Sequence, residues 1–539
     1  MNPLLQLGRP EGAGCVEPGA LAAGAPTAVR VTPHDTVAVA VRALAAGTTV
    51  DVDGLCVTLV DDVPAGHKLA LRAHEAGEPV RKYGYPIGAA TAPIAAGAWV
   101  HAHNLATRLG GPLEYRWTGA GAGGDDAARD HALGNGVHVP TFDGYRRADG
   151  RVGTRNEVWI VNTVGCVNTA AERIARTARA RFAGAPGVDG VQAFAHPYGC
   201  SQLGDDLQNT KRILAGLMRH PNAGGVLVLG LGCENNQLDA LLAAAGPEVD
   251  RSRLRFFNTQ DVVDEVDAGV EEVGALVAAM APDTRTACPA SALVLGHKCG
   301  GSDGFSGITA NPLLGRLADR VAAIGGRVLL TEVPEMFGAE QVLMERCTNE
   351  ETFEALVAMV NDFKAYFLRH GQPVYENPSP GNKAGGLTTL EEKSLGAIQK
   401  GGRAPVRDVL RYGAPIGAAF GGLSLLEAPG NDGVSCTAMV ASGATLLLFT
   451  TGRGTPLGFP VPTLKVSSNS GIAAKKPHWI DFDAGRLLGV EGPGGGVTLD
   501  ALADELLAVV LDVASGRVPT NNERNDDREI AIWKAGVTL

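Results

Sequence analysis

The 539-residue sequence has no apolar run approaching the length needed to cross a bilayer. Its first 27 residues lack the basic start and apolar block of a secretory signal. It also lacks a G-x-x-x-x-G-K-S/T loop, and no G-x-G-x-x-G opens a strand–helix unit, so nucleotide-dependent chemistry has little support. From these absences we expect a cytoplasmic protein with a small-molecule substrate and no membrane partner.

Positive charge is scarce relative to negative charge. The formal net charge is −11, which argues against a broad nucleic-acid surface. The nine cysteines are an odd number, and none forms a C-x-x-C pair. A disulfide framework and a zinc ribbon are therefore disfavoured, and reduced thiols in the cytoplasm are the simpler interpretation.

The sequence is too long for one ordinary core, and its patterning changes along its length. Residues 1–27 are rich in Gly, Ala and Pro and are expected to be a disordered extension. Residues 28–105 hold short alternating apolar runs broken by turns, which predicts a small β domain. Residues 106–140 show no apolar periodicity and indicate a linker. From residue 141 onward strands and helices alternate, which predicts an α/β fold with mostly parallel sheets.

One stretch combines the features expected of a binding turn. An apolar strand ending near Leu295 leads into residues 299–303, where Cys299, Ser302 and Asp303 stand among glycines. A helix is expected to follow, with Asn311 as its N-cap. Ligands of α/β folds lie at such turns, so Ser302 and Asp303 are predicted to bind substrate.

Four cysteines follow, or nearly follow, apolar strands. Parallel strand ends meet at one edge of a sheet, so these thiols are candidate ligands for iron or zinc. The alternative for each is a small buried hydrophobic residue. The candidates are Cys166, Cys200, Cys233 and Cys299.

Two further glycine-rich loops each carry a cation. Asn382 and Lys383 lie in one, and Arg453 and Thr455 lie in the other. Cations suit a carboxylate, and amides and hydroxyls suit sugar hydroxyls, so a polyhydroxy acid is the predicted ligand. The alternative is that both cations lie in solvated loops. Possible acid–base residues are His67, His196, Glu234, Glu335 and Asp432.

Long motifs in the same order resemble the altronate and galactarate dehydratase family. The resemblance runs from about residue 29 to the end, and the motifs at 198–206 and 101–104 look like its altronate branch. They include residues 66–68, 82–84, 149–156, 198–206, 230–236, 299–312, 331–341, 377–386, 451–456 and 521–539.

The resemblance implies an N-terminal SAF-type, β-clip-like domain (28–105), a middle α/β domain (141–285) and a C-terminal catalytic α/β domain (286–539). It also implies iron(II), replaceable by manganese, and we expect a homodimer. The ligands stay open between the four thiols, a mononuclear site with His and carboxylates, and an iron–sulfur cluster.

The activity implied is that of a metal-dependent hydro-lyase, which converts D-altronate to 2-keto-3-deoxy-D-gluconate and water. The alternatives are a dehydratase of galactarate or another sugar acid, a sulfo-lyase, or a non-catalytic sugar-acid sensor. In our mechanistic hypothesis Lys383 and Arg453 stabilise an enediolate, while His67 and His196 serve as acid and base without assignment between them. A role for His67 requires the β domain to fold over the catalytic domain.

Overall fold

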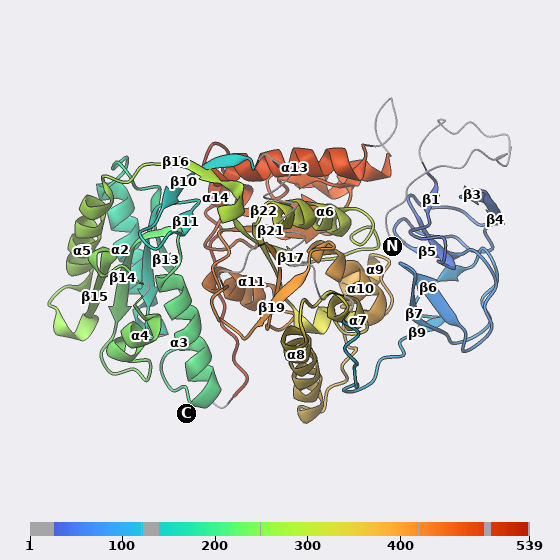
Figure 1. The fold of residues 1–539 in the computed structure, drawn as a ribbon, viewed down its shortest axis with the longest axis horizontal. Coiled ribbons are helices and arrows are strands. Elements are labelled where there is room, and N and C mark those ends of the chain that lie inside the picture. Colours follow the sequence, from blue (N-terminus) through green and yellow to red (C-terminus); the bar gives the residue numbers. More distant parts are fainter. Residues whose placement is uncertain are drawn as a thin grey trace.

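The computed structural model describes residues 26–119, 121, 139–247, 249–417, 421–489 and 497–536. The expected disordered extension and most of the predicted linker beyond residue 121 lie outside these ranges. Three parts follow one another along the long axis of the molecule (Figure 1). The middle domain lies at one end, the C-terminal domain is central, and the N-terminal β domain packs at the other end.

The N-terminal domain is built of short antiparallel strands joined by tight turns. They form a four-stranded sheet of order β1-β2-β5-β8, a pair β3-β4 and a three-stranded sheet β6-β7-β9. Their bounds are β1 Ala28–Val29, β2 Val37–Ala40, β3 Thr49–Val52, β4 Leu55–Thr58, β5 Lys68–Ala70, β6 Pro79–Lys82, β7 Tyr85–Ala90, β8 Trp99–Val100 and β9 Leu105–Ala106. Strand β8 ends before His101, so His101 and His103 lie in a turn.

The middle domain has a parallel sheet of order β13-β12-β14-β15, and its helices α2 and α5 pack on each other. Its strands read as continuous apolar runs because both faces are covered. The elements are β10 Thr141–Arg146, β11 Val152–Gly153, β12 Glu157–Asn162, α2 Asn168–Arg181, β13 Gly190–Phe194, α3 Gly204–Met218, β14 Ala223–Gly230, α4 Leu238–Ala245, β15 Leu254–Asn258 and α5 Glu265–Met280. Strand β10 pairs with β16, Thr286–Pro289, which leads into the next domain.

The C-terminal domain is organised around a seven-stranded parallel sheet of order β19-β20-β18-β17-β21-β22-β23. Strand β17 is central, so the turn that follows it lies in the middle of the sheet's carboxyl edge. The strands are β17 Val294–Cys299, β18 Arg327–Leu330, β19 Val406–Leu410, β20 Gly422–Leu426, β21 Leu446–Thr451, β22 Thr463–Ser467 and β23 Phe482–Asp483. The helices are α6 Ala310–Ala323, α7 Glu340–Met344, α8 Glu350–Arg369, α9 Pro380–Ala384, α10 Leu390–Ala397, α11 Asp432–Ala441, α12 Ser470–Lys475, α13 Leu499–Ala514 and α14 Asn521–Asn525.

These sheets confirm the predicted fold class, a small β domain followed by α/β domains with parallel sheets. The predicted cap of α6 is wrong. The helix begins at Ala310, so Asn311 lies inside its first turn. The Asn311 amide instead donates to the Gly396 carbonyl and accepts from the Thr450 hydroxyl, which ties α6 to α10 and β21. None of the described helices is long and apolar enough to span a bilayer.

One apolar core joins the N-terminal and C-terminal domains. Val80 and Ile87 of the β domain share it with Leu313 and Leu330 of the C-terminal domain. The backbone oxygen of Gly66 lies so close to Gly304 that a Cβ at Gly304 would stand 1.8 Å from it. The β domain therefore packs directly over the turn that follows β17.

Candidate active site

Residues 300–304 form a turn at the carboxyl end of β17, where only small residues fit. A Cβ at Gly300 would stand 2.5 Å from the Asp432 carboxylate and from the Phe449 ring. Gly301 has a φ of +65°, which favours glycine. The glycines thus let the chain pass between α11 and β21 and leave its backbone close to any ligand.

The loops predicted to bind substrate converge on this turn. The Asn382 side-chain amide donates to the Ser302 carbonyl at 2.8 Å. The backbone amide of Arg453 donates to the Gly301 carbonyl at 3.0 Å. The Gly304 amide donates to the Gly385 carbonyl at 2.8 Å. Segments far apart in sequence are therefore brought together around Ser302, as the pattern of glycines and polar residues suggested.

The two predicted cations remain available to a ligand. Lys383 is half-buried on α9, and Arg453 is exposed in the loop after β21. Among the described residues neither charged group has a hydrogen bond or ion pair. The Thr455 hydroxyl accepts a hydrogen bond from the Leu457 amide at 3.3 Å, so its own proton is free to bind an oxygen.

Asp303 is placed as part of the scaffold. Its carboxylate accepts hydrogen bonds from the Ser306 hydroxyl at 2.8 Å, the Ser468 hydroxyl at 2.8 Å and the Asn469 amide at 3.0 Å. It also accepts from the Phe305 amide. Burial raises the pKa of Asp303, although these hydrogen bonds act in the opposite direction. We interpret Asp303 as the residue that fixes the turn, with little capacity left for substrate.

His67 lies at the junction of the β domain and α9, against Ala384. Its Nε2 is 3.4 Å from the Ala384 carbonyl, and its Nδ1 accepts a hydrogen bond from the Trp99 indole at 3.2 Å. The proton of the neutral ring is therefore on Nε2. Burial, followed by the charge of Lys68, lowers the pKa of His67, so the ring is neutral at pH 7. The His101 ring stands 4.9 Å from it.

His196 is held by its own domain. Its Nε2 donates to the Asn162 carbonyl at 2.9 Å, and its Nδ1 accepts from the Tyr198 amide at 3.2 Å. Burial lowers its pKa. Both ring nitrogens are used by the backbone, so His196 has no free lone pair for a substrate and is interpreted as structural.

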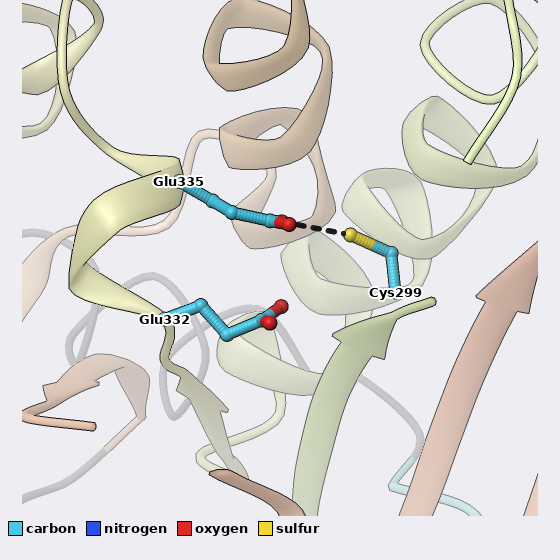
Figure 2. A group of neighbouring side chains, drawn as sticks. All are labelled: Cys299, Glu332 and Glu335. Atoms are coloured by element: carbon cyan, nitrogen blue, oxygen red, sulfur yellow. Dashed lines mark hydrogen bonds between the residues drawn. The ribbon is translucent and has the colours of Figure 1, made fainter. Parts of the chain in front are cut away.

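Beneath the turn lies a buried group of charged side chains at the ends of β17 and β18. Figure 2 shows Cys299 at the end of β17 and Glu332 and Glu335 reaching toward it from the neighbouring segment. The Cys299 thiol donates to the Glu335 carboxylate at 3.1 Å. The group, called here the lysine–carboxylate cluster, consists of the buried Lys298, Cys299, Glu332, Glu335, Lys393 and Lys400, with the half-buried Asp432 at its edge.

The cluster pairs every acidic group with an ammonium group. Lys298 lies 2.6 Å from Glu332 and 2.7 Å from Asp432. Lys393 lies 2.7 Å from Glu335 and also donates to the side-chain oxygen Oδ1 of Asn382 at 3.3 Å. The cluster is thus connected through Asn382 to the turn above it.

The two glutamates have pKa values that are pushed apart. Burial and the nearby Glu335 charge raise the pKa of Glu332 to about 8. Burial acts on Glu335 too, but the ammonium groups of Lys393, Lys298 and Lys400 outweigh it and lower the pKa of Glu335. Burial also raises the pKa of the Cys299 thiol to about 11. The two shifts run in opposite directions, so Glu332 is the member of the pair that holds a proton more readily, a pattern typical of acid–base sites.

Cys299, Glu332 and Glu335 also form a group whose ligand atoms lie within 4.8 Å of one another, as a bound metal would require. Each donor, however, already faces a lysine: Lys400 lies 3.0 Å from the Cys299 sulfur, and Lys298 and Lys393 pair with the two glutamates. A divalent cation would add positive charge to a buried site whose negative charge is already compensated. The lysine–carboxylate cluster does not fit the iron that the resemblance implies.

The predicted four-thiol set is divided between two sheets. Cys299 is buried in the C-terminal sheet, whereas Cys166, Cys200 and Cys233 are exposed at the middle domain. Sequence reasoning named Glu335 and Asp432 but missed Lys298, Glu332, Lys393 and Lys400. Lys298 and Glu332 could have been found, because both stand at strand ends. Lys393 and Lys400 come after α9 in the sequence, and no sequence pattern near them indicates that they lie close to Cys299 and Glu335.

Comparisons with known proteins cover the described domains. Family models match at residues 26–108 (altronate/galactarate dehydratase SAF domain), 144–281 (D-galactarate dehydratase/altronate hydrolase, second domain) and 290–538 (D-galactarate/altronate dehydratase, C-terminal). The chain is 52% identical to altronate dehydratase of Escherichia coli over 95% of this chain and 99% of the relative. The chain belongs to the altronate/galactarate dehydratase family.

Two further relatives show the breadth of this family. Altronate dehydratase of Bacillus subtilis is 48% identical over 95% of this chain and 99% of its own length. Galactarate dehydratase (L-threo-forming) of E. coli is 33% identical over 93% of this chain and 95% of its own length. The family resemblance expected from the sequence motifs is thereby confirmed.

Proposed function

We propose that this chain dehydrates D-altronate to 2-keto-3-deoxy-D-gluconate and water. As a member of its family the chain is an enzyme, a hydro-lyase. The choice of substrate is supported by one observation above others, the 52% identity to an altronate dehydratase over nearly the full length of both chains. The geometry agrees with a sugar acid, because two free cations flank a glycine-rich turn.

In the proposed binding mode Lys383 and Arg453 hold the substrate carboxylate. A guanidinium can bind both oxygens, and an ammonium adds a second positive charge. The Thr455 hydroxyl and the exposed peptide groups of the turn then bind sugar hydroxyls. The two cations contribute to catalysis only if they bind the charge that develops as C2 loses its proton more strongly than they bind the resting carboxylate.

Dehydration requires a base for the C2 proton and an acid for the departing C3 hydroxyl. The base takes the C2 proton, and the electron pair of the C2–H bond forms the C2–C3 double bond. The C3 hydroxyl takes a proton from the acid and leaves as water. The resulting enol becomes the 2-keto acid. His67 is the proposed base, because it is neutral at pH 7 and lies against α9, the helix that carries Lys383. Its Nδ1 must release the Trp99 indole to accept the C2 proton, since Nε2 carries the proton of the neutral ring. Glu332 is the proposed acid of the lysine–carboxylate cluster, because its raised pKa keeps a proton available.

Iron(II), or manganese in its place, remains part of the proposal. Such an ion would act as a Lewis acid on a carboxylate or hydroxyl oxygen. No step is assigned to it at the lysine–carboxylate cluster, whose lysines already occupy the donors. A homodimer in the cytoplasm also remains a prediction, and light scattering of the purified protein tests the oligomeric state.

The test is anaerobic turnover with and without iron(II). The substrates are altronate, galactarate, talarate, gluconate, mannonate and sulfolactate, with 2-keto-3-deoxy acid or sulfite as the product measured. We expect metal-dependent product from altronate and little from the others. Product from galactarate or sulfolactate instead would overturn the substrate assignment, and binding of altronate without turnover would overturn the activity.

A further inference from the structure

Three exposed thiols stand at one edge of the middle domain. Strands β13, β12 and β14 are parallel neighbours, so their carboxyl ends meet at the same edge. Cys166 follows β12, Cys200 follows β13 and Cys233 follows β14. All three are exposed, whereas Cys288, Cys299, Cys347 and Cys436 are buried. The lysine–carboxylate cluster involves none of the three.

Hydrogen bonds tie the three cysteine-bearing loops to one another. The amide of Gly165, next to Cys166, donates to the Tyr198 carbonyl at 2.8 Å. The carbonyl of Gly199, next to Cys200, accepts from the Asn236 amide at 2.9 Å.

The loop that carries Cys233 is bonded to the other two. The Asn236 side chain donates to the Thr163 carbonyl at 3.0 Å, and the Asn235 side chain accepts from the Ser201 amide at 2.7 Å. The three thiols are therefore carried on one cross-linked surface.

The surface is also polarised to hold negative charge. Helices α2, α3 and α4 begin just after the three cysteines, and none has a side-chain cap at its N-terminus. Their dipoles favour negative charge at this edge, where Asp205, Asp206 and Asp239 already lie in the first turns of α3 and α4. In addition, the amide nitrogen of Gln202, two residues from Cys200, is buried without a hydrogen-bond partner among the described residues. It is a spare donor close to the thiols.

The spacing of the thiols selects the kind of metal group. A single tetrahedral ion with sulfur ligands at about 2.3 Å would bring them to about 3.8 Å from one another. Among the described residues the three sulfurs do not form a group within 4.8 Å. A cluster of several irons and sulfides holds its thiolates further apart than a single ion does and is itself anionic, which suits thiols beyond that limit at an edge of helix N-termini.

We propose that Cys166, Cys200 and Cys233 bind a four-iron, four-sulfide cluster and leave one iron without a protein thiolate. The proposal goes beyond the proposed function: an open iron on the middle domain, apart from the turn beside Lys383 and Arg453, would be a Lewis acid for an oxygen donor. Cluster binding itself requires no particular substrate. It places iron on the middle domain, away from the donors that the lysines of the lysine–carboxylate cluster occupy.

The test is the metal and sulfide content of the full-length protein, purified anaerobically and reconstituted with iron(II) and sulfide. We expect about four irons and four acid-labile sulfides per chain, with the Mössbauer and electron paramagnetic resonance signals of such a cluster. Cys166→Ser, Cys200→Ser and Cys233→Ser should each lose most of the iron and sulfide. Cys288→Ala, at a buried thiol of β16, is the matched control and should keep both.

Circular dichroism checks that each variant is folded before its iron is counted. Iron without sulfide, zinc in place of iron, or full iron and sulfide in all three serine variants would overturn the proposal. The readout needs no substrate, so failure here is separable from failure of the altronate assignment. A protein that holds the cluster but leaves altronate unchanged would refute only the proposed function.

Discussion

The ammonium group of Lys68 and the carboxylate of Glu392 lie 2.9 Å apart, and both side chains are entirely buried. Lys68 belongs to the N-terminal β domain and Glu392 to α10 of the C-terminal domain. Lys82 lies 2.8 Å from the same carboxylate. One glutamate thus compensates two lysines of the other domain, and these lysines hold its pKa low despite its burial. The position of His67 over α9 depends on this contact.

Glu392→Gln should release the β domain. It leaves two buried ammonium groups without a carboxylate, and removing one partner of a buried pair costs about 3–5 kcal/mol. We expect faster proteolytic cleavage between residues 106 and 140, a lower unfolding midpoint and loss of turnover. Arg72→Ala removes the exposed pair with Glu78 in the same domain and should change none of these.

Gly304→Ala tests the same contact without changing a charge. Its Cβ would stand 1.8 Å from the Gly66 oxygen, so the two domains cannot pack as they do. We expect the same proteolytic sensitivity and at least a tenfold loss of kcat/KM. Gly381→Ala is the control, since no atom lies within 4 Å of its added Cβ. Wild-type proteolysis and turnover in Gly304→Ala would show that the β domain does not pack over the turn.

Lys383→Gln and Arg453→Gln should weaken substrate binding without unfolding the protein. Each group is free of other partners among the described residues, so its loss breaks no internal contact. A hydrogen bond to a charged group contributes about 1.5–3 kcal/mol, which corresponds to about a 10- to 150-fold rise in KM. Steady-state kinetics and thermal unfolding together check both parts. An unchanged KM in both variants would place the carboxylate elsewhere.

The Trp99 indole should set the pH profile through His67. Its N–H donates to an unprotonated Nδ1, so it favours the neutral ring. As the base, His67 must be neutral, and kcat/KM should fall as the pH drops through its pKa, which lies below 6.5. Trp99→Phe removes the donor and should move this acid limb to higher pH by up to about one unit. His67→Gln should abolish the limb and lower kcat about 10²- to 10⁴-fold. A limb that persists in His67→Gln would assign the base to another residue.

Acid should destabilise the fold partly through His220. This ring is fully buried, and burial lowers its pKa to about 3. Its Nε2 donates to the Ala444 carbonyl, and its Nδ1 accepts from the Asn222 amide. The unfolded chain binds a proton near pH 6.5 and the folded chain does not, so stability falls as the pH drops below 6.5.

At pH 5 the contribution of His220 is about 2 kcal/mol relative to pH 7. Urea unfolding at the two pH values measures the total loss, and His220→Gln should reduce it by about that amount. An equal pH dependence in wild type and His220→Gln would show that this histidine is not responsible.

The sequence predicted the parts of the site that carry local signals. Glycine-rich turns after apolar strands marked Ser302, Asn382 and Arg453, and the structure brings these three segments together. It could not separate Asp303, whose bonding capacity is used internally, from residues that are free to bind. His196 was similarly misleading, because the bonds that occupy both its nitrogens come from the chain around it and leave no pattern in the sequence.

The lysine–carboxylate cluster was largely invisible for a different reason. Lys393 and Lys400 lie about a hundred residues from Cys299 in sequence, and only the packing of α10 beneath the turn brings them near it. A lysine in a helix is normally exposed to solvent, and the sequence around these two lysines did not predict that they are buried. The pairing with Glu335 and Cys299 is a property of the tertiary structure alone.

The contact between the β domain and α9 also fixes when the site can exist during synthesis. His67 leaves the ribosome first, and Lys383 and Arg453 emerge more than three hundred residues later. Until then the chain carries His67 without the two cations, and without the Glu392 of α10 that pairs with Lys68 and Lys82. The site is therefore complete only when the C-terminal domain has been made.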